Sequence, residues 1–261
     1  MKLSVREGSY KAAPLDLPLE TSFSQLAALG YDGVELSTIP DREARGYRQR
    51  RGVWPDKLFT EQRAAIRASA AKAGIEIATL SSDWAWGYSE YFPTLDGWGR
   101  GVELLLEDAK LAADLGAKAI LIHFGTSKGT WDQTRGILKE LALAAEPTGV
   151  TFGYEGSLFY PLGLGGQPEL VRMVDEVNSP ALKIYVHPHG DTESQVRWID
   201  EVGERICALH ASALDPSVDY RQVFAALKRA NYDGYWCFEV ADDLFGSSAS
   251  GFRELARQYQ V

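Results

Sequence analysis

The chain of 261 residues is 45% hydrophobic, which is enough to bury a sizeable core and excludes a disordered chain. Its formal net charge of −9 argues against nucleic acid as a partner, because a nucleic acid backbone selects a basic surface. Two cysteines cannot form a disulfide framework, which fits a reducing compartment. No apolar run approaches the roughly 18 residues of a membrane span, and the N-terminus lacks a signal-peptide pattern. We therefore expect a cytoplasmic protein with no membrane partner.

One pattern repeats along the chain: an amphipathic stretch ends at Gly or Asn, and a short apolar run follows that ends in a polar residue. These runs are rich in Val, Ile, Tyr and Phe and show little alternation, which is typical of parallel strands covered on both faces. The first run is the N-terminal KLSVRE. Seven more lie within residues 26–37, 70–83, 112–125, 146–156, 177–190, 202–212 and 228–240.

The segments between these runs carry helix signals. Thr60 can cap the stretch that begins there. Thr192 with Gln195, and Asp219 with Gln222, have the spacing of capping boxes. Eight strands that alternate with helices over about 250 residues predict an α/β fold, a single (β/α)8 TIM barrel, and a doubly wound open sheet is the alternative.

No linker or composition shift divides the chain, so we expect one domain over residues 1–261. Two connections, 38–59 and 81–100, are too long to be simple turns. Both follow predicted strands, and in a barrel such loops lie on the C-terminal face, where active sites form.

The two long loops differ in character. The second holds Trp84 and Trp86, which can stack on the apolar face of a sugar ring, although an oligomer contact is the competing interpretation. The first is basic over residues 42–51 and could take a phosphate or carboxylate, although a solvated loop is the commoner explanation.

Histidine and glutamate side chains gather at the ends of the predicted strands. Four of them come from successive strands: Glu155, His187, His210 and Glu239. Strand ends converge in a barrel, so these four side chains can meet around one divalent ion. Two carboxylates and two imidazoles suit Mn²⁺, Fe²⁺, Co²⁺ or Zn²⁺ better than Mg²⁺ or Ca²⁺. A lone histidine at a strand end is more often structural, but every histidine of this chain falls on the same predicted face.

With these residues, the sequence resembles the xylose isomerase-like TIM barrels, in particular the sugar (phosphate) isomerase/epimerase family. The resemblance spans essentially the whole chain, and its most specific stretches are LGYDGVELS, GVTFGYEG, LHAS and VDYRQVFAALKRANYDGYWCFEV. It implies one divalent ion, with Mn²⁺ favoured over Zn²⁺, Co²⁺ and Fe²⁺, bound by Glu155, His187, His210 and Glu239. The chain departs from the family pattern at His187, where Asp is usual, and it has no Arg over residues 211–219.

The resemblance implies an enzyme that removes a proton next to the carbonyl of a ketose or keto-sugar through a metal-stabilised enediolate. Glu155 and Glu239 are then the catalytic acid–base pair. A metal-dependent lyase or dehydratase acting on a keto-inositol or 3-keto-glycoside is the second hypothesis, motivated by His187, His189 and the aromatic loop. A non-catalytic sugar-binding barrel is a third. An endonuclease IV-like enzyme is disfavoured, because its sites need more His and Asp ligands and a basic surface.

Three further residues are candidate substrate contacts. His123 either contacts a substrate oxygen or is a structural residue beneath its loop, and His189 either contacts substrate or supports a ligand. Glu35 closes the second run and can face the pocket mouth with Arg6, where a structural ion pair is the simpler explanation. The expected partner is a small carbohydrate, and a homo-oligomer is also expected, since barrels of this family are often dimers or tetramers.

Overall fold

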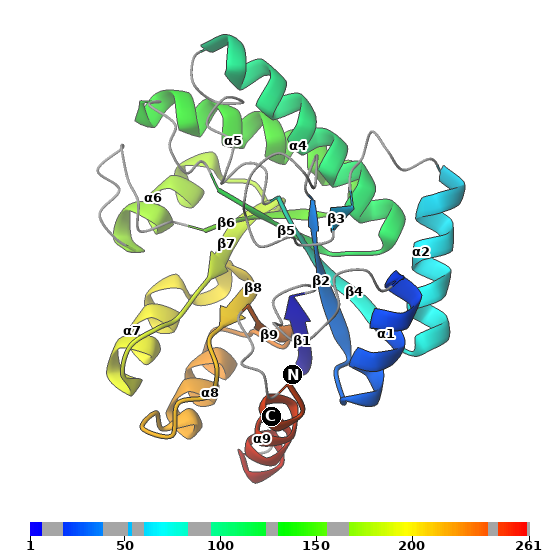
Figure 1. Ribbon diagram of the computed structural model, residues 1–261. Coiled ribbons are helices and arrows are strands. Elements are labelled where there is room, and N and C mark those ends of the chain that lie inside the picture. The colour runs from blue at the N-terminus through cyan, green and yellow to red at the C-terminus, as the bar shows by residue number, and fades with distance from the viewer. Residues whose placement is uncertain are drawn as a thin grey trace.

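A computed structural model describes residues 1–6, 18–38, 52–53, 60–82, 95–123, 130–155, 167–239 and 245–259. Figure 1 shows the helices arranged outside a set of parallel strands. No helix among these residues is long and apolar enough to cross a membrane.

The strands form a closed parallel barrel. Its strands are β1 (Lys2–Arg6), β2 (Gly33–Thr38), β4 (Glu76–Ser81), β5 (Ala119–Ile122), β6 (Thr151–Tyr154), β7 (Leu182–Val186), β8 (Ile206–Ala211) and β9 (Tyr235–Phe238). Neighbours in this series pair in parallel, and β1 pairs with both β2 and β9, which closes the sheet. The two-residue strand β3 (Gly52–Val53) extends parallel to the end of β2. The predicted barrel is therefore confirmed, and the open sheet is excluded because its edge strands would not pair with each other.

Helices follow the strands and cover their outer faces. They are α1 (Leu19–Ala28), α2 (Thr60–Ala73), α4 (Leu95–Leu115), α5 (Trp131–Ala145), α6 (Gln167–Val177), α7 (Thr192–Val202), α8 (Tyr220–Arg229) and α9 (Phe245–Tyr259), with the short 3₁₀ turns η3 (Glu146–Thr148) and η4 (Gly203–Arg205). Their apolar faces pack against the strands in one large core, which includes Leu105, Leu138 and Phe224. A second, smaller cluster lies inside the barrel and includes Leu121, Tyr185 and Ala208.

The start of α7 differs from its predicted cap. Asp191, and not Thr192, is the N-cap residue, and its carboxylate accepts the backbone N–H of Ser194 at 2.9 Å. The hydroxyl of Thr192 instead accepts the backbone N–H of Asp219 at 2.8 Å. Asp219 caps α8 as predicted. The Thr192 hydroxyl therefore connects the starts of two adjacent helices, which are also the ends of two strand-to-helix loops.

Candidate active site

The carboxyl ends of β5 to β9 bring five predicted site residues together. They are His123, Glu155, His187, His210 and Glu239. Four of these follow the last residue of a strand, and His210 is the fifth residue of β8. The strands are neighbours in the barrel and run in parallel, so their ends meet at one face.

The backbone fixes both glutamates that end strands. The N–H of Glu155 donates to the carbonyl of Ile122 at 3.2 Å, and the N–H of Glu239 donates to the carbonyl of Ala211 at 3.0 Å. Both bonds continue the pairing of adjacent strands by one residue. The two side chains therefore start from positions that the barrel sets, and not from free loops.

Glu155 lies between two imidazoles. Its Oε2 atom is 3.3 Å from Nε2 of His123, and its Oε1 atom is 3.3 Å from Nδ1 of His187. Burial acts to raise the pKa of Glu155, but the attraction of His123 and the hydrogen bond with His187 outweigh it and lower the pKa to about 2. Glu155 is consequently an ionised carboxylate, which can bind a cation or accept a proton.

Glu239 approaches the same imidazole from the other side. Its Oε2 atom is 3.6 Å from Nδ1 of His187, while its Oε1 atom accepts a hydrogen bond from Nη1 of Arg6 at 2.8 Å. Arg6 is only 5% exposed, so this ion pair is held inside the barrel mouth. His187 thus lies between two carboxylates, and one of them is anchored by a buried cation.

His210 completes the cluster from below. Its ring is fully buried and packs on Tyr185, with the ring centroids 4.6 Å apart. Burial acts to lower the pKa of His210, but the carboxylate of Glu35, 2.8 Å from Nε2, raises the pKa well above its ordinary value. The other ring nitrogen, Nδ1, is buried and has no hydrogen-bond partner among the residues that the structure describes.

The donor set fits a divalent ion. One donor atom each from Glu155, His187 and His210 lie within 4.8 Å of one another, and Glu239 reaches the same imidazole. Two carboxylates and two imidazoles are the ligands that borderline divalent metals bind in proteins. A buried imidazole nitrogen without a partner is unfavourable unless a ligand satisfies it. These residues are therefore the ones that could hold a metal.

Glu35 does not lie where the sequence predicted it. It is the third residue of β2, which continues to Thr38, and its side chain is 0% exposed. Glu35 is expected to close the second run, but β2 continues through Leu36, Ser37 and Thr38, which are all buried. Glu35 is therefore beneath His210 and not at the pocket mouth. The expected pairing with Arg6 is present, with Nε of Arg6 3.7 Å from Oε1 of Glu35.

The remaining predicted contacts lie at the rim or outside the described residues. His189 is exposed, and its Nδ1 atom is 3.0 Å from the backbone carbonyl of His187. Its ring centroid is 6.3 Å from that of His187. Trp84, Trp86 and the basic residues 42–51 fall outside the described part of the chain.

Two side chains that the sequence did not single out join the cluster: the hydroxyls of Tyr185 and Thr79 donate to Glu35 at 2.6 and 2.7 Å. Arg6, expected beside Glu35, also contacts Glu239. A signal for Tyr185 exists, because it lies two residues before His187 and alternate residues of a strand share a face. Thr79 carries no such signal, since only strand register brings it to Glu35.

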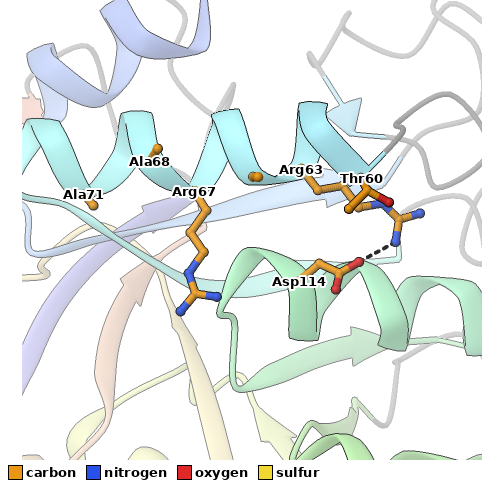
Figure 2. A pocket seen from close by; sticks show the side chains of 7 residues that line it. Thr60, Arg63, Arg67, Ala68, Ala71 and Asp114 are labelled. Atoms are coloured by element: carbon orange, nitrogen blue, oxygen red, sulfur yellow. Dashed lines mark hydrogen bonds and ion pairs between the residues drawn. The ribbon is translucent and has the colours of Figure 1, made fainter.

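A separate groove of about 400 Å³ lies on the outer helical layer (Figure 2). Residues of α2 and α4 line it, and Nη1 of Arg63 donates to Asp114 across it at 2.7 Å. No strand-end residue contributes to its walls. We therefore place the functional site at the strand ends and not in this groove.

Comparison with known proteins agrees with the barrel. The family profile described as "Xylose isomerase-like TIM barrel" matches residues 23–259. No similar curated protein sequence was found at a significant level. The solved structures that resemble the chain include D-psicose 3-epimerase from Clostridium cellulolyticum H10, with 16% identity, a TM-score of 0.75 and 99% of each chain covered.

Two other solved structures show the same likeness. D-allulose 3-epimerase from Methylomonas sp. has 17% identity and a TM-score of 0.71, with 99% of this chain and 97% of that chain covered. The 3-keto-D-glucoside 4-epimerase from E. coli has 15% identity and a TM-score of 0.70, with 97% and 99% covered. At such identities these structures bear on the fold alone. The family profile spans most of the chain, and the protein therefore belongs to the xylose isomerase-like TIM barrel family.

Proposed function

We propose that the protein is a sugar isomerase or epimerase, which removes a proton next to the carbonyl of a ketose or keto-sugar. The observation that carries this proposal is the arrangement of His187 between two carboxylates, Glu155 at 3.3 Å and Glu239 at 3.6 Å. Family membership supports the proposal, and so do the structural neighbours, which include the three sugar epimerases described above.

The metal ligands in this proposal are Glu155, His187, His210 and Glu239. The two carboxylates neutralise a divalent ion, and the two imidazoles favour Mn²⁺, Zn²⁺, Co²⁺ or Fe²⁺ over Mg²⁺. We favour Mn²⁺. An ion held there supplies Lewis-acid polarisation of the substrate carbonyl.

Glu155 and Glu239 are also the proposed acid–base pair. They come from β6 and β9, on either side of β7 and β8, so they can approach a bound sugar from different directions. One glutamate accepts the substrate proton as a carboxylate, and the other, entering the step as the carboxylic acid, donates a different proton to the opposite face. Arg6 holds one oxygen of Glu239, which leaves the other oxygen turned toward His187. His123 holds one oxygen of Glu155 in the same way, within 3.3 Å.

The rim of the site supplies the proposed substrate contacts. His189 is exposed beside His187 and can donate to a sugar hydroxyl. Trp84 and Trp86 remain candidates for stacking on the sugar ring. Loss of a β-hydroxyl or alkoxide from the same carbanion would make the enzyme a lyase, and the product of the reaction separates the two outcomes.

Solvent exchange tests the proposal directly. Metal-free protein is incubated in D₂O with a panel of ketoses, keto-inositols and 3-keto-glycosides, with and without added Mn²⁺, and NMR follows loss of the C–H signal next to the carbonyl. We expect metal-dependent deuterium incorporation in at least one sugar, and we expect Glu155→Gln to abolish it. Glu193→Gln is the matched control, because Glu193 lies in the first turn of α7 and not in the cluster.

Two results would overturn the proposal. One is purified protein that binds no divalent ion and exchanges no proton in any sugar of the panel. The other is exchange that Glu155→Gln and Glu239→Gln leave at the wild-type rate. A deuterated stereoisomer or positional isomer supports the isomerase assignment, whereas an unsaturated or cleaved product assigns the lyase.

A further inference from the structure

We infer that Glu35 is a positioning residue, which binds Nε2 of His210 so that Nδ1 is the atom presented to the metal. The inference rests on the proposed function, because it takes the ion to lie among Glu155, His187, His210 and Glu239. It adds a residue beneath the ligands, and it assigns which nitrogen of His210 binds.

The contact between the two side chains is short and shielded from water. Nε2 of His210 lies 2.8 Å from Oε1 of Glu35, and both side chains are 0% exposed. A carboxylate oxygen accepts hydrogen bonds, so the imidazole nitrogen facing it carries the proton. Once Nε2 holds the proton, the lone pair of the neutral ring is on Nδ1.

Nδ1 is also the nitrogen left over by the packing. It is buried and makes no hydrogen bond of normal geometry with the described residues, although the thiol of Cys237 lies close enough to the ring to raise the pKa of His210. Donor atoms of His210, Glu155 and His187 lie within 4.8 Å of one another. Histidines that bind metals commonly donate their other ring N–H to a carboxylate, which fixes both the tautomer and the orientation of the ring. Glu35 and His210 have this arrangement.

The barrel register holds Glu35 in place from both sides. Arg6 of β1 and Thr79 of β4 are the register partners of Glu35 on the two neighbouring strands, so all three side chains point to the same face. The hydroxyl of Thr79 donates to Oε2 at 2.7 Å, and Nε of Arg6 is 3.7 Å from Oε1.

A fourth strand adds another donor. The hydroxyl of Tyr185 on β7 donates to Oε2 of Glu35 at 2.6 Å. Every polar neighbour in these contacts donates to the carboxylate, which keeps Glu35 an acceptor on both oxygens. The carboxylate is thus held by β1, β4 and β7 as well as by its own strand, and a side chain held in this way can fix the ring above it.

A competing arrangement uses the same carboxylate as a metal ligand. Donor atoms of Glu35, His210 and Cys237 also lie within 4.8 Å of one another, and all three residues are buried. Two hydroxyl donors already occupy Oε2 of Glu35, and the guanidinium of Arg6 lies beside Oε1, where it would repel a second cation. The contacts therefore favour a positioning role for Glu35, and Cys237 provides the means to separate the two roles.

Co²⁺ binding to the metal-free protein tests the inference. In Glu35→Gln the side chain keeps its size but has one acceptor oxygen to share between His210 and the two hydroxyls. We expect its Co²⁺ affinity, measured by calorimetric titration, to fall by about 10- to 100-fold. Glu193→Gln is the matched control, since it makes the same substitution in the first turn of α7 outside the cluster, and it should bind Co²⁺ as the wild type does.

A second measurement needs no variant and does not depend on the stability of Glu35→Gln. In wild-type protein with ¹⁵N-labelled histidine and Zn²⁺ bound, NMR should show His210 protonated at Nε2 and bound through Nδ1. Metal coordination through Nε2 would overturn the inference. A thiolate-to-Co²⁺ absorption band that disappears in Cys237→Ser would also overturn it, because Glu35 would then belong to a separate metal site.

The outcomes distinguish this inference from the proposed function. Wild-type protein that binds no divalent ion removes the positioning role, and it removes the proposed function as well when no sugar of the panel exchanges a proton. Wild-type binding that persists unchanged in a folded Glu35→Gln variant removes the positioning role and leaves the four-residue site in place.

Discussion

Replacing Tyr185 with phenylalanine removes one hydroxyl from the middle of the barrel. That hydroxyl donates to Oε2 of Glu35 at 2.6 Å, and both side chains are fully buried. Burial acts to raise the pKa of Glu35, but His210 and Arg6 outweigh it and lower the pKa to about 2, so the acceptor is charged. Burial and the same carboxylate raise the pKa of Tyr185 well above its ordinary value, which keeps the hydroxyl protonated.

Hydrogen bonds to charged groups contribute about 1.5–3 kcal/mol each to stability. Thr79 at 2.7 Å and His210 at 2.8 Å still donate to Glu35 in the variant, so its charge is not left without partners. We therefore expect Tyr185→Phe to lower the free energy of unfolding of the metal-free protein by about 2 kcal/mol. Urea denaturation with an unchanged m-value would measure this loss.

Tyr232→Phe is the matched comparison. The hydroxyl of Tyr232 donates to the backbone carbonyl of Tyr235 at 2.6 Å, which is an equally short bond to a neutral acceptor. A neutral bond contributes about 1 kcal/mol, so this variant should lose about half as much stability. Equal losses in the two variants would refute the reasoning, because the charge of Glu35 would then contribute nothing to the bond with Tyr185.

Three other measurements follow from the structure. Gly153→Ala should destabilise by about 1–3 kcal/mol in urea titrations, because a Cβ there would lie 2.8 Å from the sulfur of a neighbouring cysteine, whereas Gly136→Ala, in open space on α5, should not destabilise. Divalent-ion binding near neutral pH should release a proton from His210, whose pKa is raised, and calorimetry in buffers of different ionisation enthalpy should detect it. The pKa values of Glu35 and Glu155 are lowered from 4.5 to about 2, so the stability that these ionised carboxylates provide is fully present above pH 4.5 and is lost as the pH falls toward 2. In an acid titration followed by circular dichroism, Glu155→Gln should therefore lose less stability than the wild type does. An identical titration profile for the two proteins would contradict this.

The barrel could be predicted because its signals are local and repeated. Each strand is a short apolar run and each helix before it ends in a cap, so counting the copies gives the architecture. The clustering of Glu155, His187, His210 and Glu239 could be predicted for a related reason, since parallel strands of a closed barrel end at one face. Distances between these residues, and the role of each nitrogen, depend on strand register and side-chain rotamers, which no local pattern encodes.

The position of Glu35 shows where this kind of prediction stops. The sequence shows the end of an apolar run, but β2 continues as Leu36, Ser37 and Thr38, all buried. A strand that lines the inside of a barrel near its mouth can carry polar side chains, because neighbouring strands supply their partners. Thr79 and Arg6 are such partners, and their register with Glu35 is a property of the assembled sheet.

The charges around the cluster suggest why Arg6 lies where it does. Glu35, Glu155 and Glu239 would together carry three negative charges in a space with little solvent, which is unfavourable without compensation. Arg6 contacts two of the three carboxylates and cancels one charge, so two remain, which equals the charge of one divalent ion. Removing Arg6 would leave an excess that one such ion cannot balance. The buried pair of Arg6 and Glu35 therefore has an electrostatic role as well as a structural one. It limits the net charge that the ligands Glu155 and Glu239 present to a divalent cation.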